Sequence, residues 1–356
     1  MKNTLSKYLK LFMCGVLFIS GISVCSSKVV NAAETNTLIN NNEELIISMR
    51  ADDEKSNIIK FNTTSKECNE LISNQEVWLS GNLTEDKSNL VYMNAIGEET
   101  WQVFSLNLKK NINSKVTTDK LGKFNGKAGK DGNTVYFGAF DKSTKLPKIE
   151  KYNVNDNSAF VFDAADNDRS LEGFDARNDK IIAVMISKEE DSKRGKVHKK
   201  GTPEPSVTYS IYELNTSGSD IKKIADIKAS IIYKISYSYD CKKAIINGKN
   251  INNDNDEGIY EVNIENGQLT KTLTENMFKS DQNSVISDIG HENAVLSKDG
   301  TKLYFVASSK SVGNFLVDGI TSKPQDIYSY DLKTNKITQV YGFRKHTIIT
   351  DLTISY

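Results

Sequence analysis

Few side chains in this sequence have the types and spacing that covalent catalysis requires. The chain has three histidines, His198, His291 and His346, and it contains neither a G-x-S-x-G nor an H-E-x-x-H motif. The first motif presents a serine nucleophile, and the second holds a catalytic zinc ion. Their absence excludes the common serine hydrolase and metalloprotease mechanisms, and the sequence assigns no catalytic residue.

Carboxylates are the remaining source of catalysis, because sugar-cleaving enzymes place two of them beside the scissile glycosidic bond. The acids best placed for this role are Asp166, Asp168, Glu172, Asp288 and Glu292. Either Arg169 or Arg177 would then hold an anionic substrate. A carbohydrate-active enzyme, either a glycosidase or a lyase, is therefore the alternative function.

Two acidic segments carry oxygen ligands suited to a hard cation such as calcium, Asn252 to Glu257 and Asp163 to Arg169. In the first, Gly258 falls one position late for an EF-hand loop and no acid stands at the closing position. The second has the simpler interpretation of a solvent-exposed link. We therefore expect no metal and no cofactor.

The side chains best suited to bind a ligand are aromatic, apolar or basic residues within polar segments. Trp78 is a candidate for stacking on a sugar or a peptide, although core packing is the simpler explanation of Trp78 and Trp101. Phe315 and Leu316 interrupt a polar segment, either as a protein-binding anchor or as a plug over an opening. The predicted ligand-binding set is Trp78, Arg169, Arg177, His291, Phe315 and Leu316.

An internal repeat indicates which elements position these residues. Near the end of the chain, Leu296 to Val306 reads L-S-K-D-G-T-K-L-Y-F-V, in which an Asp-Gly turn joins two β-rich segments. Asp326 to Val340 then supplies two more strands around a K-T-N-K turn. Together these segments form one four-stranded antiparallel unit.

The end of the third strand of this unit recurs six times, at intervals of 45, 46, 62, 48 and 68 residues. Each copy has an Asn or Asp at the same position: Asn62, Asn107, Asn153, Asn215, Asn263 and Asp331. Such a side chain accepts hydrogen bonds from the backbone of the turn that follows, so we interpret these residues as structural. Units of this size cannot bury both faces alone and must pack against one another.

The two ends of the chain complete one unit between them. Ile349 to Tyr356 reads as an inner strand, whereas the segment from Asn40 begins a unit at its second strand. Pairing these ends closes a ring and removes the exposed sheet edge of an open stack. The sequence therefore predicts an all-β fold: a single six-bladed β-propeller over residues 34–356, closed by pairing of the N- and C-terminal strands in one blade.

One face of this ring should carry most of the long irregular segments. Chain direction reverses at each turn, so loops between second and third strands share a face with the links between blades. Three consecutive blades have long loops on this face, Ser187 to Ser206, Gly248 to Gly258 and Ser308 to Gln325. Long loops in a compact repeat are often functional, so we expect the ligand on the same face.

The run L-S-K-D-G-T-K-L-Y-F-V, followed by D-I-Y-S-Y-D-L, resembles the repeats of the TolB-like, WD40-like (PD40) propellers. The resemblance spans about Leu38 to Tyr356. It departs from the pattern because no blade has the Pro common before the Asp, and only two blades keep both Asp and Gly. The resemblance implies extracytoplasmic protein binding without catalysis.

The first 33 residues read as a secretory signal, with three lysines ahead of an apolar run from Leu11 to Val24 and small residues ending at Ala33. Cys25 loosely matches a lipoprotein box, so lipid anchoring is an alternative. Loss of four leader lysines leaves 42 basic against 46 acidic side chains, which argues against nucleic acid as a partner. We expect a secreted or cell-surface monomer without a membrane span, which holds a protein, a peptide or a cell-wall polymer.

Two cysteines, Cys68 and Cys241, remain once the leader is removed. They belong to blades that are not adjacent in the ring, and a disulfide needs Cα atoms within about 7 Å of each other. We therefore expect both thiols to be free and buried.

Overall fold

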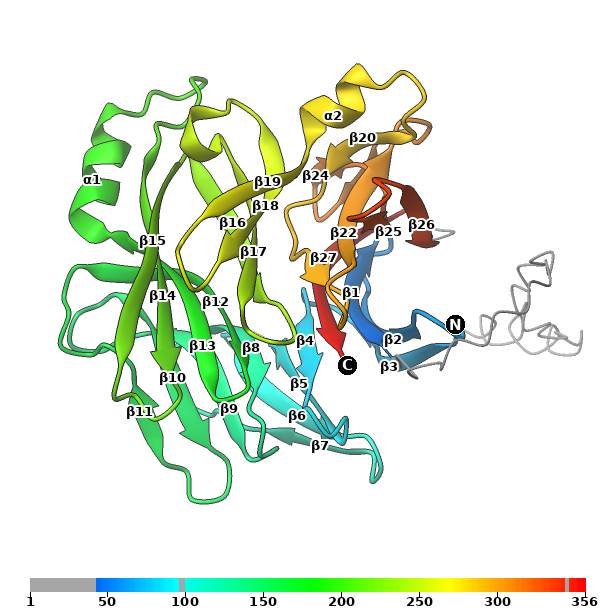
Figure 1. The fold of residues 1–356 in the computed structure, drawn as a ribbon. Helices are drawn as coiled ribbons and strands as arrows, with labels where there is room; N and C mark the ends of the chain where they lie inside the picture. The colour runs from blue at the N-terminus through cyan, green and yellow to red at the C-terminus, as the bar shows by residue number, and fades with distance from the viewer. Residues whose placement is uncertain (1–42, 96–99, 343–345) are drawn as a thin grey trace, which may run out of the picture. The chain divides into compact units, whose positions relative to one another are not determined.

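Six antiparallel sheets follow one another along the chain in the computed structural model, which describes residues 43–95, 100–342 and 346–356 (Figure 1). All of these residues belong to one compact unit, residues 40–356. The predicted secretory signal and Cys25 lie outside the described residues. The structure confirms the all-β fold and the six-bladed propeller.

In each blade the strands follow one another from the ring centre outward. Blade 1 contains β27 (Thr347–Ser355), β1 (Glu44–Ala51), β2 (Ser56–Asn62) and β3 (Cys68–Gln75), and blade 2 contains β4 (Ser80–Leu83), β5 (Asn89–Asn94), β6 (Gln102–Asn107) and β7 (Ile112–Lys115). Blade 3 contains β8 (Lys123–Ala128), β9 (Thr134–Phe140), β10 (Pro147–Asn153) and β11 (Ala159–Val161), and blade 4 contains β12 (Arg169–Arg177), β13 (Lys180–Ser187), β14 (Val207–Asn215) and β15 (Ile221–Ala229). Blade 5 contains β16 (Ile231–Tyr237), β17 (Lys243–Lys249), β18 (Glu257–Asn263) and β19 (Leu269–Thr274). Blade 6 has an inner strand in two parts, β20 (Ile286–Ile289) and β21 (Val295–Leu296), followed by β22 (Lys302–Ser309), β25 (Gln325–Asp331) and β26 (Ile337–Tyr341).

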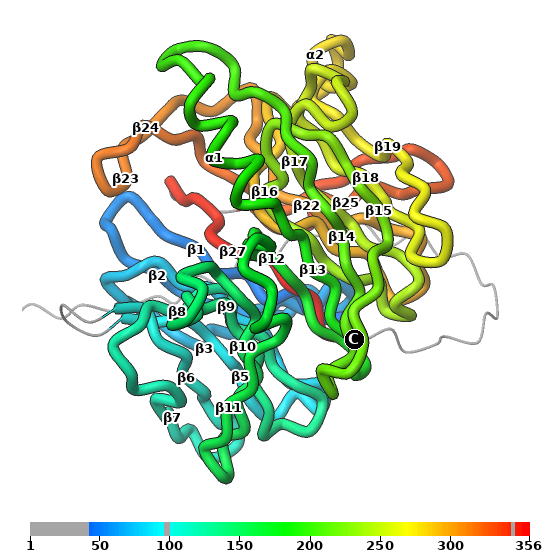
Figure 2. Tube along the Cα trace, turned by 90° about the vertical axis from the view of Figure 1, so that its left-hand side faces the viewer, coloured from blue at the N-terminus to red at the C-terminus, as the bar shows by residue number. Residues whose placement is uncertain are grey.

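The ring is closed as the termini predict. In blade 1 the C-terminal β27 pairs with the N-terminal β1 from Glu44↔Ser355 to Ala51↔Thr347, and Figure 1 shows blue β1 beside red β27. The inner strands also contact one another around the ring, in the order β27, β4, β8, β12, β16, β21 and back to β27. Figure 2 shows the blades following one another in chain order from blue through green to orange.

The hydrophobic core is divided among the six junctions between neighbouring blades. Alternate residues of a strand point to opposite faces of its sheet, so each middle strand supplies two cores. In β22, for example, Leu303 and Phe305 pack in the cluster shared with blade 5, whereas Tyr304 packs in the cluster shared with blade 1. This arrangement explains why the middle strands are nearly continuously apolar.

The six predicted Asx residues each end the third strand of a blade, and their side chains bond the following turn. Asn263 Oδ1 accepts hydrogen bonds from the backbone N–H groups of Glu265 at 2.9 Å and Asn266 at 3.1 Å. Equivalent bonds are made by Asn62, Asn107, Asn153, Asn215 and Asp331. The structural interpretation of these residues is confirmed.

The face with long loops contains more regular structure than the sequence predicts. The segment from Ser187 to Ser206 begins with helix α1 (Lys188–Val197), and the other structured insertions are α2 (Glu275–Ser280), the short 3₁₀ helix η1 (Ile251–Asn253) and the hairpin of β23 (Phe315–Val317) and β24 (Ile320–Ser322). Ser187 caps α1 by accepting a hydrogen bond from the Glu190 N–H at 3.2 Å. The sequence S-K-E-E has the form of a capping box, so the signal for this helix was present.

Both cysteines are free, as predicted, but only Cys241 is buried. Burial raises the pKa of the Cys241 thiol to about 11, so it is not a reactive thiolate at neutral pH. Cys68 begins the outer strand β3 and is exposed, within 3.5 Å of the Tyr341 hydroxyl. The prediction of burial was wrong for Cys68 because only inner and middle strands lie between two neighbouring blades.

Candidate functional site

A cavity of about 240 Å³ opens where the inner strands end, on the face of short turns. Every blade contributes to its lining: Asn82, Lys127, Asp175, Tyr237, Val295 and Leu352 come from β4, β8, β12, β16, β21 and β27 respectively. The cavity is therefore the opening of the ring itself. It lies on the face opposite the one on which the long loops led us to expect a ligand.

Two charged groups of the cavity wall, Lys127 and Asp175, are paired with each other. The Lys127 ammonium lies 3.6 Å from Asp175 Oδ1, and Asp175 Oδ2 accepts a hydrogen bond from the Tyr237 backbone N–H at 2.9 Å. The side chains of Lys127 and Asp175 are only 3% and 11% exposed. Because each charge already has a partner, this pair serves to hold β8, β12 and β16 together at the wall.

Arg177, at the end of β12, lies in a different environment. Its guanidinium lies over the Tyr356 ring, 4.6 Å from the centroid, and one terminal nitrogen lies 3.5 Å from the Ile354 carbonyl oxygen. Its Nε is buried without a hydrogen-bond partner, and among the described residues no carboxylate forms an ion pair with it. Unsatisfied donors of this kind are uncommon in folded proteins.

Two tyrosines, Tyr356 and Tyr239, form the rim beside Arg177, and a third, Tyr237, lies buried in the core between blades 4 and 5. The Tyr356 hydroxyl donates to the Leu296 carbonyl at 2.7 Å, and the Tyr239 ring meets the Tyr356 ring edge-on at 5.0 Å. Lys298 lies over Tyr239, 4.5 Å from its centroid. The Tyr237 hydroxyl donates to Glu213 at 3.0 Å; burial and this carboxylate raise the pKa of Tyr237. The rim is thus held before any ligand binds.

Below the cavity lies a second polar cluster. Asn293 Nδ2 donates to Asp351 Oδ1 at 3.0 Å, and the Lys234 ammonium lies 3.4 Å from Glu292 Oε2, which makes no hydrogen bond. Burial raises the pKa of Glu292, and the Glu292 carboxylate raises the pKa of Lys234. Two carboxylates and one ammonium therefore occupy the ring interior.

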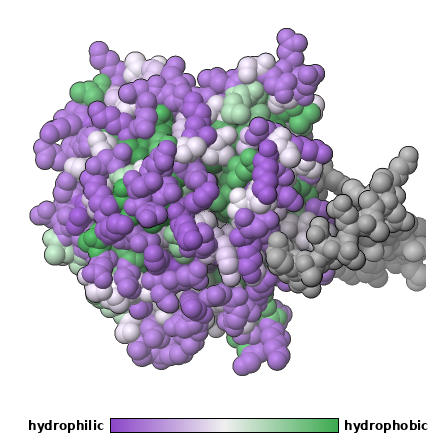
Figure 3. Space-filling view, viewed as in Figure 1, coloured by the Kyte–Doolittle hydropathy of each residue, from purple (hydrophilic) through white to green (hydrophobic). Residues whose placement is uncertain are grey.

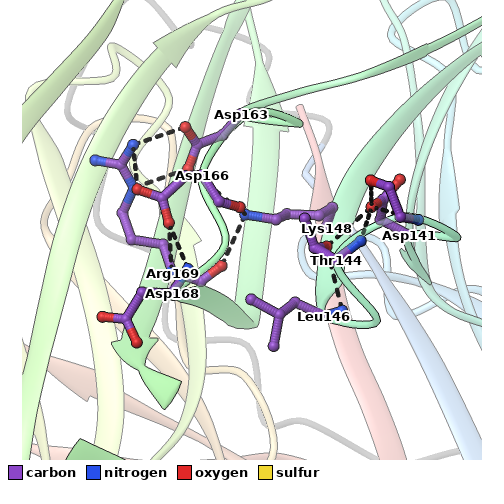
Figure 4. A network of polar contacts seen from close by, with 9 residues as sticks. Asp141, Thr144, Leu146, Lys148, Asp163, Asp166, Asp168 and Arg169 are labelled. Carbon is purple, nitrogen blue, oxygen red and sulfur yellow. Dashed lines mark hydrogen bonds and ion pairs between the residues drawn. The ribbon is translucent and has the colours of Figure 1, made fainter. Parts of the chain in front are cut away.

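Of the six predicted ligand-binding residues, only Arg177 lines the cavity. Arg169, at the other end of β12, forms ion pairs with Asp163 at 2.7 Å and Asp166 at 3.1 Å (Figure 4). In the same network the Lys148 ammonium donates to the carbonyl oxygens of Asp166 and Arg169. Arg169 therefore joins blades 3 and 4, and its guanidinium is already occupied.

Trp78, Phe315 and Leu316 come together on the face with long loops. The Trp78 Nε1 donates a hydrogen bond to Asp318 at 2.6 Å. Asp318 also accepts two hydrogen bonds from the guanidinium of Arg50, at the end of β1. Phe315 is buried with Ile348, whereas Leu316 is 64% exposed. Phe315 thus seals hairpin β23–β24 against the inner strand of blade 1, and Figure 2 shows this orange hairpin beside the blue β1.

The remaining predicted residues are dispersed. His291 stacks on Tyr233 at 4.0 Å and lies 3.6 Å from Glu257, whose pKa is lowered to about 2, chiefly by its bond with His291. Asp288 pairs with Lys323, and Asp168 accepts the Glu189 N–H. The five acids considered for catalysis therefore do not form one cluster. Core packing was the wrong explanation for both tryptophans, because Trp78 is 38% exposed and Trp101 is 44% exposed.

Sequence reasoning missed Asn82, Lys127, Asp175, Tyr237 and Tyr356. A signal was nevertheless present, because four of these residues lie one to three positions before a turn between a first and a second strand. Aligning the repeats on that turn would have placed them at one level of the ring. Their proximity follows only once the ring is assumed to close.

Comparison with known proteins supports the fold. TolB from Acinetobacter baumannii superposes with a TM-score of 0.57 and 12% identity, over 87% of this chain and 67% of TolB. The chain has a TolB-like propeller fold. A chain of a nidogen/laminin complex matches with a TM-score of 0.56 and 11% identity over 88% of this chain and 98% of its own length. An oligogalacturonate lyase in complex with manganese matches with a TM-score of 0.51 and 14% identity, over 84% of this chain and 73% of the lyase chain.

At these identities the similarity is one of fold alone. No family model and no curated protein matches this chain in sequence. Within the described ranges there is no helix long and apolar enough to cross a membrane. In the same part of the chain no three His, Cys, Asp or Glu side chains are grouped to hold a metal ion.

Proposed function

We propose that this chain is an exported, non-catalytic binding propeller whose central cavity receives a peptide segment of a partner protein. The observation that carries the proposal is the cavity itself, to which all six blades contribute and whose wall is already fixed by internal contacts. A wall that needs no reordering lowers the entropic cost of binding. One neighbour of similar fold, the nidogen/laminin chain, belongs to a protein complex, which is compatible with this role.

The state of the wall carboxylate favours binding over catalysis. Asp175 is held by Lys127 and by the Tyr237 backbone N–H. A glycosidase acid must hold a proton, and its partner carboxylate must approach the sugar from the other side. An aspartate neutralised by an adjacent ammonium is suited to neither task.

A peptide fits this rim better than a sugar does. Sugars stack on open aromatic faces, whereas Arg177 lies over Tyr356 and Lys298 lies over Tyr239. The side of the molecule seen in Figure 3 is mainly hydrophilic, with separate apolar areas. The cavity lining itself includes Glu85, Lys130 and Asp179, so a polar, extended segment suits it more than an apolar helix. A cell-wall polymer is the competing ligand.

Export rests on residues 1–33, whose lysines and apolar run have the form of a secretory signal. We place the mature propeller, residues 34–356, outside the cytoplasm as a monomer. Acylation at Cys25 would instead hold it on the membrane surface. Labelling of the exported protein with a fatty-acid analogue separates these two forms.

The function is tested by panning random linear peptides, displayed on phage, against the purified propeller. Enriched peptides should bind the unmodified chain and lose about tenfold in affinity for Tyr239→Ala at the cavity rim. Leu316→Ala, which removes an exposed side chain on the opposite face, is the control and should bind normally. Peptides sensitive only to Leu316→Ala, or no enrichment, would contradict the proposal.

A carbohydrate-active enzyme is the second candidate, because Glu292 and Asp351 lie with Lys234 in the ring interior and burial raises the pKa of Glu292. A lyase abstracts a proton, and a raised pKa suits that work. Incubation with oligogalacturonate, with ultraviolet detection of unsaturated ends, tests for a lyase. An assay of new reducing ends on wall polysaccharides tests for a glycosidase, and Glu292→Gln is the control for both.

A further inference from the structure

We propose that Arg177 makes the central cavity a site for a single carboxylate, which an acidic side chain of the bound peptide supplies. This inference rests on the proposed function and names the chemistry of its ligand. It starts from a comparison among the four arginines that the structure describes. Three of them meet a carboxylate: Arg50 pairs with Asp318, Arg169 with Asp163 and Arg194 with Asp191. Arg177 does not.

The donor groups of Arg177 are therefore largely unused. A guanidinium carries five N–H donors. Among the described residues, Arg177 donates to one oxygen, the Ile354 carbonyl oxygen, at 3.5 Å. Nε is buried and has no hydrogen-bond partner among the described residues. A carboxylate that enters the cavity would accept hydrogen bonds from the terminal nitrogens of Arg177, as a two-pronged pair.

The guanidinium is also positioned in advance. It lies over the Tyr356 ring at 4.6 Å, an attractive cation–π arrangement. Tyr356 is itself held by its hydroxyl bond to the Leu296 carbonyl and by the edge of Tyr239. A ligand therefore meets an arginine whose plane is already set, which reduces the entropy lost on binding.

The surrounding charges select a single carboxylate over a polyanion. Asp175 is neutralised by Lys127, so it does not compete for Arg177. At the mouth, exposed Lys130 and Lys298 add positive charge, and exposed Glu85 and Asp179 offset it and repel further negative charge. A phosphate or a run of acids would meet that repulsion, and one carboxylate on an otherwise neutral segment would not.

The test titrates the purified propeller with two blocked amino acids, acetyl-glutamate methylamide and acetyl-glutamine methylamide, and follows the amide signals of the protein by NMR. The glutamate compound should bind at least tenfold more tightly, because hydrogen bonds to a charged group are the stronger kind. The shifts should map to residues around the cavity. Equal affinity for the two compounds would overturn the inference.

Two variants locate the effect. Arg177→Gln should remove the preference for glutamate, and Arg177→Lys should keep part of it because the charge remains without the fork. Lys199→Gln, on the opposite face, should leave the preference intact. Arg177 forms no ion pair with the described residues, so Arg177→Gln should still fold, and thermal unfolding checks this. If the folded Arg177→Gln variant keeps the full preference for the glutamate compound, the inference is overturned.

A third ligand separates this inference from the proposed function. If digalacturonate binds more tightly than acetyl-glutamate methylamide, the inference that a peptide supplies the carboxylate is overturned. That result would support the second candidate function, a carbohydrate-active enzyme. If panned peptides bind the cavity equally well after their acids are changed to amides, the peptide-binding function stands and the carboxylate inference is overturned.

Discussion

The two faces of the propeller differ in loop length and in how their side chains are used. On the face with long loops, the insertions pack back onto the ring: β23–β24 buries Phe315 and Val317 against Ile348, and Asp318 joins Arg50 and Trp78. On the opposite face, short turns stabilised by their own Asx residues leave the inner strand ends uncovered. The cavity lies on this second face.

Loop length is therefore a poor guide to the site in this fold. The long hairpin reaches from blade 6 to the closing blade, where the ring depends on strands from both ends of the chain. Asp318 and Phe315 of this hairpin make contacts that stabilise the closing blade. The short turns of the opposite face do not extend over the ring opening, so the side chains at the ends of the inner strands stay accessible.

The largest stability effect should come from Asp318→Ala on the face with long loops. This change leaves the Arg50 guanidinium, whose side chain is 4% exposed, with only the Ser56 hydroxyl at 3.1 Å. Breaking such a pair should cost about 2 kcal/mol, less than for a fully buried pair because Asp318 is partly exposed. Urea unfolding measures the loss. Peptide binding at the cavity should persist; its loss would mean that the two faces are coupled.

A smaller effect is expected from Asn263→Ala on the face of short turns. It removes two hydrogen bonds to turn N–H groups and should lower the free energy of unfolding by about 1 kcal/mol. Asn263→Asp keeps the acceptor oxygen and is the control. Equal destabilisation by the two changes would show that the amide nitrogen, and not the turn bonds, matters.

The face with long loops should also carry a pH dependence. Desolvation near α1 raises the pKa of Glu172 to about 7, with Asp191 adding to the rise and Arg194 opposing it, although the side chain stays accessible to solvent. Between its usual value of 4.5 and about 7 the folded chain keeps a proton that the unfolded chain has lost, so stability should fall as pH rises. The fall should stay within about 1 kcal/mol because solvent screens the group.

Glu172→Gln should remove this part of the pH dependence. Urea midpoints of both proteins at pH 5 and pH 7 provide the measurement. If the unmodified chain and the variant lose stability in parallel over this range, another group is responsible.

The smallest effect should follow Lys199→Gln together with Lys200→Gln, beyond the end of α1. Both side chains are exposed, so the free energy of unfolding should change by less than about 0.5 kcal/mol. At each salt concentration the variant should bind peptide as tightly as the unmodified chain does. Weaker binding by the variant would return the ligand to this face.

Much of the architecture was predictable because its signals are local. The six Asx residues act on the turn immediately after them, and apolar alternation records which strands lie between two blades. Even α1, which was missed, has its capping box in the sequence at Ser187 and Glu190. The candidate site was predictable only at Arg177, because nothing near a residue in sequence shows whether a distant carboxylate reaches it.

Inner-strand bulges illustrate the limit. Register shifts occur beside Asn125, Glu172, Tyr233, Ser287 and Thr350 in five of the inner strands. Each extra residue reverses which following side chains face the ring interior. The alternation seen in the sequence cannot reveal such a reversal, because the partner strand decides where the pairing slips.

The sequence by itself determined the number of blades, the strand order and the closure by the two chain ends, since these follow from short-range hydrogen bonds and from the need to pair every edge. Only the tertiary structure decided which face is open and which arginine is free. Asp163 lies six residues from Arg169 along the chain and Asp318 lies 268 residues from Arg50, yet both satisfy an arginine. Closing the ring brings an acid to Arg50 and Tyr356 to Arg177, and the fold alone makes that difference.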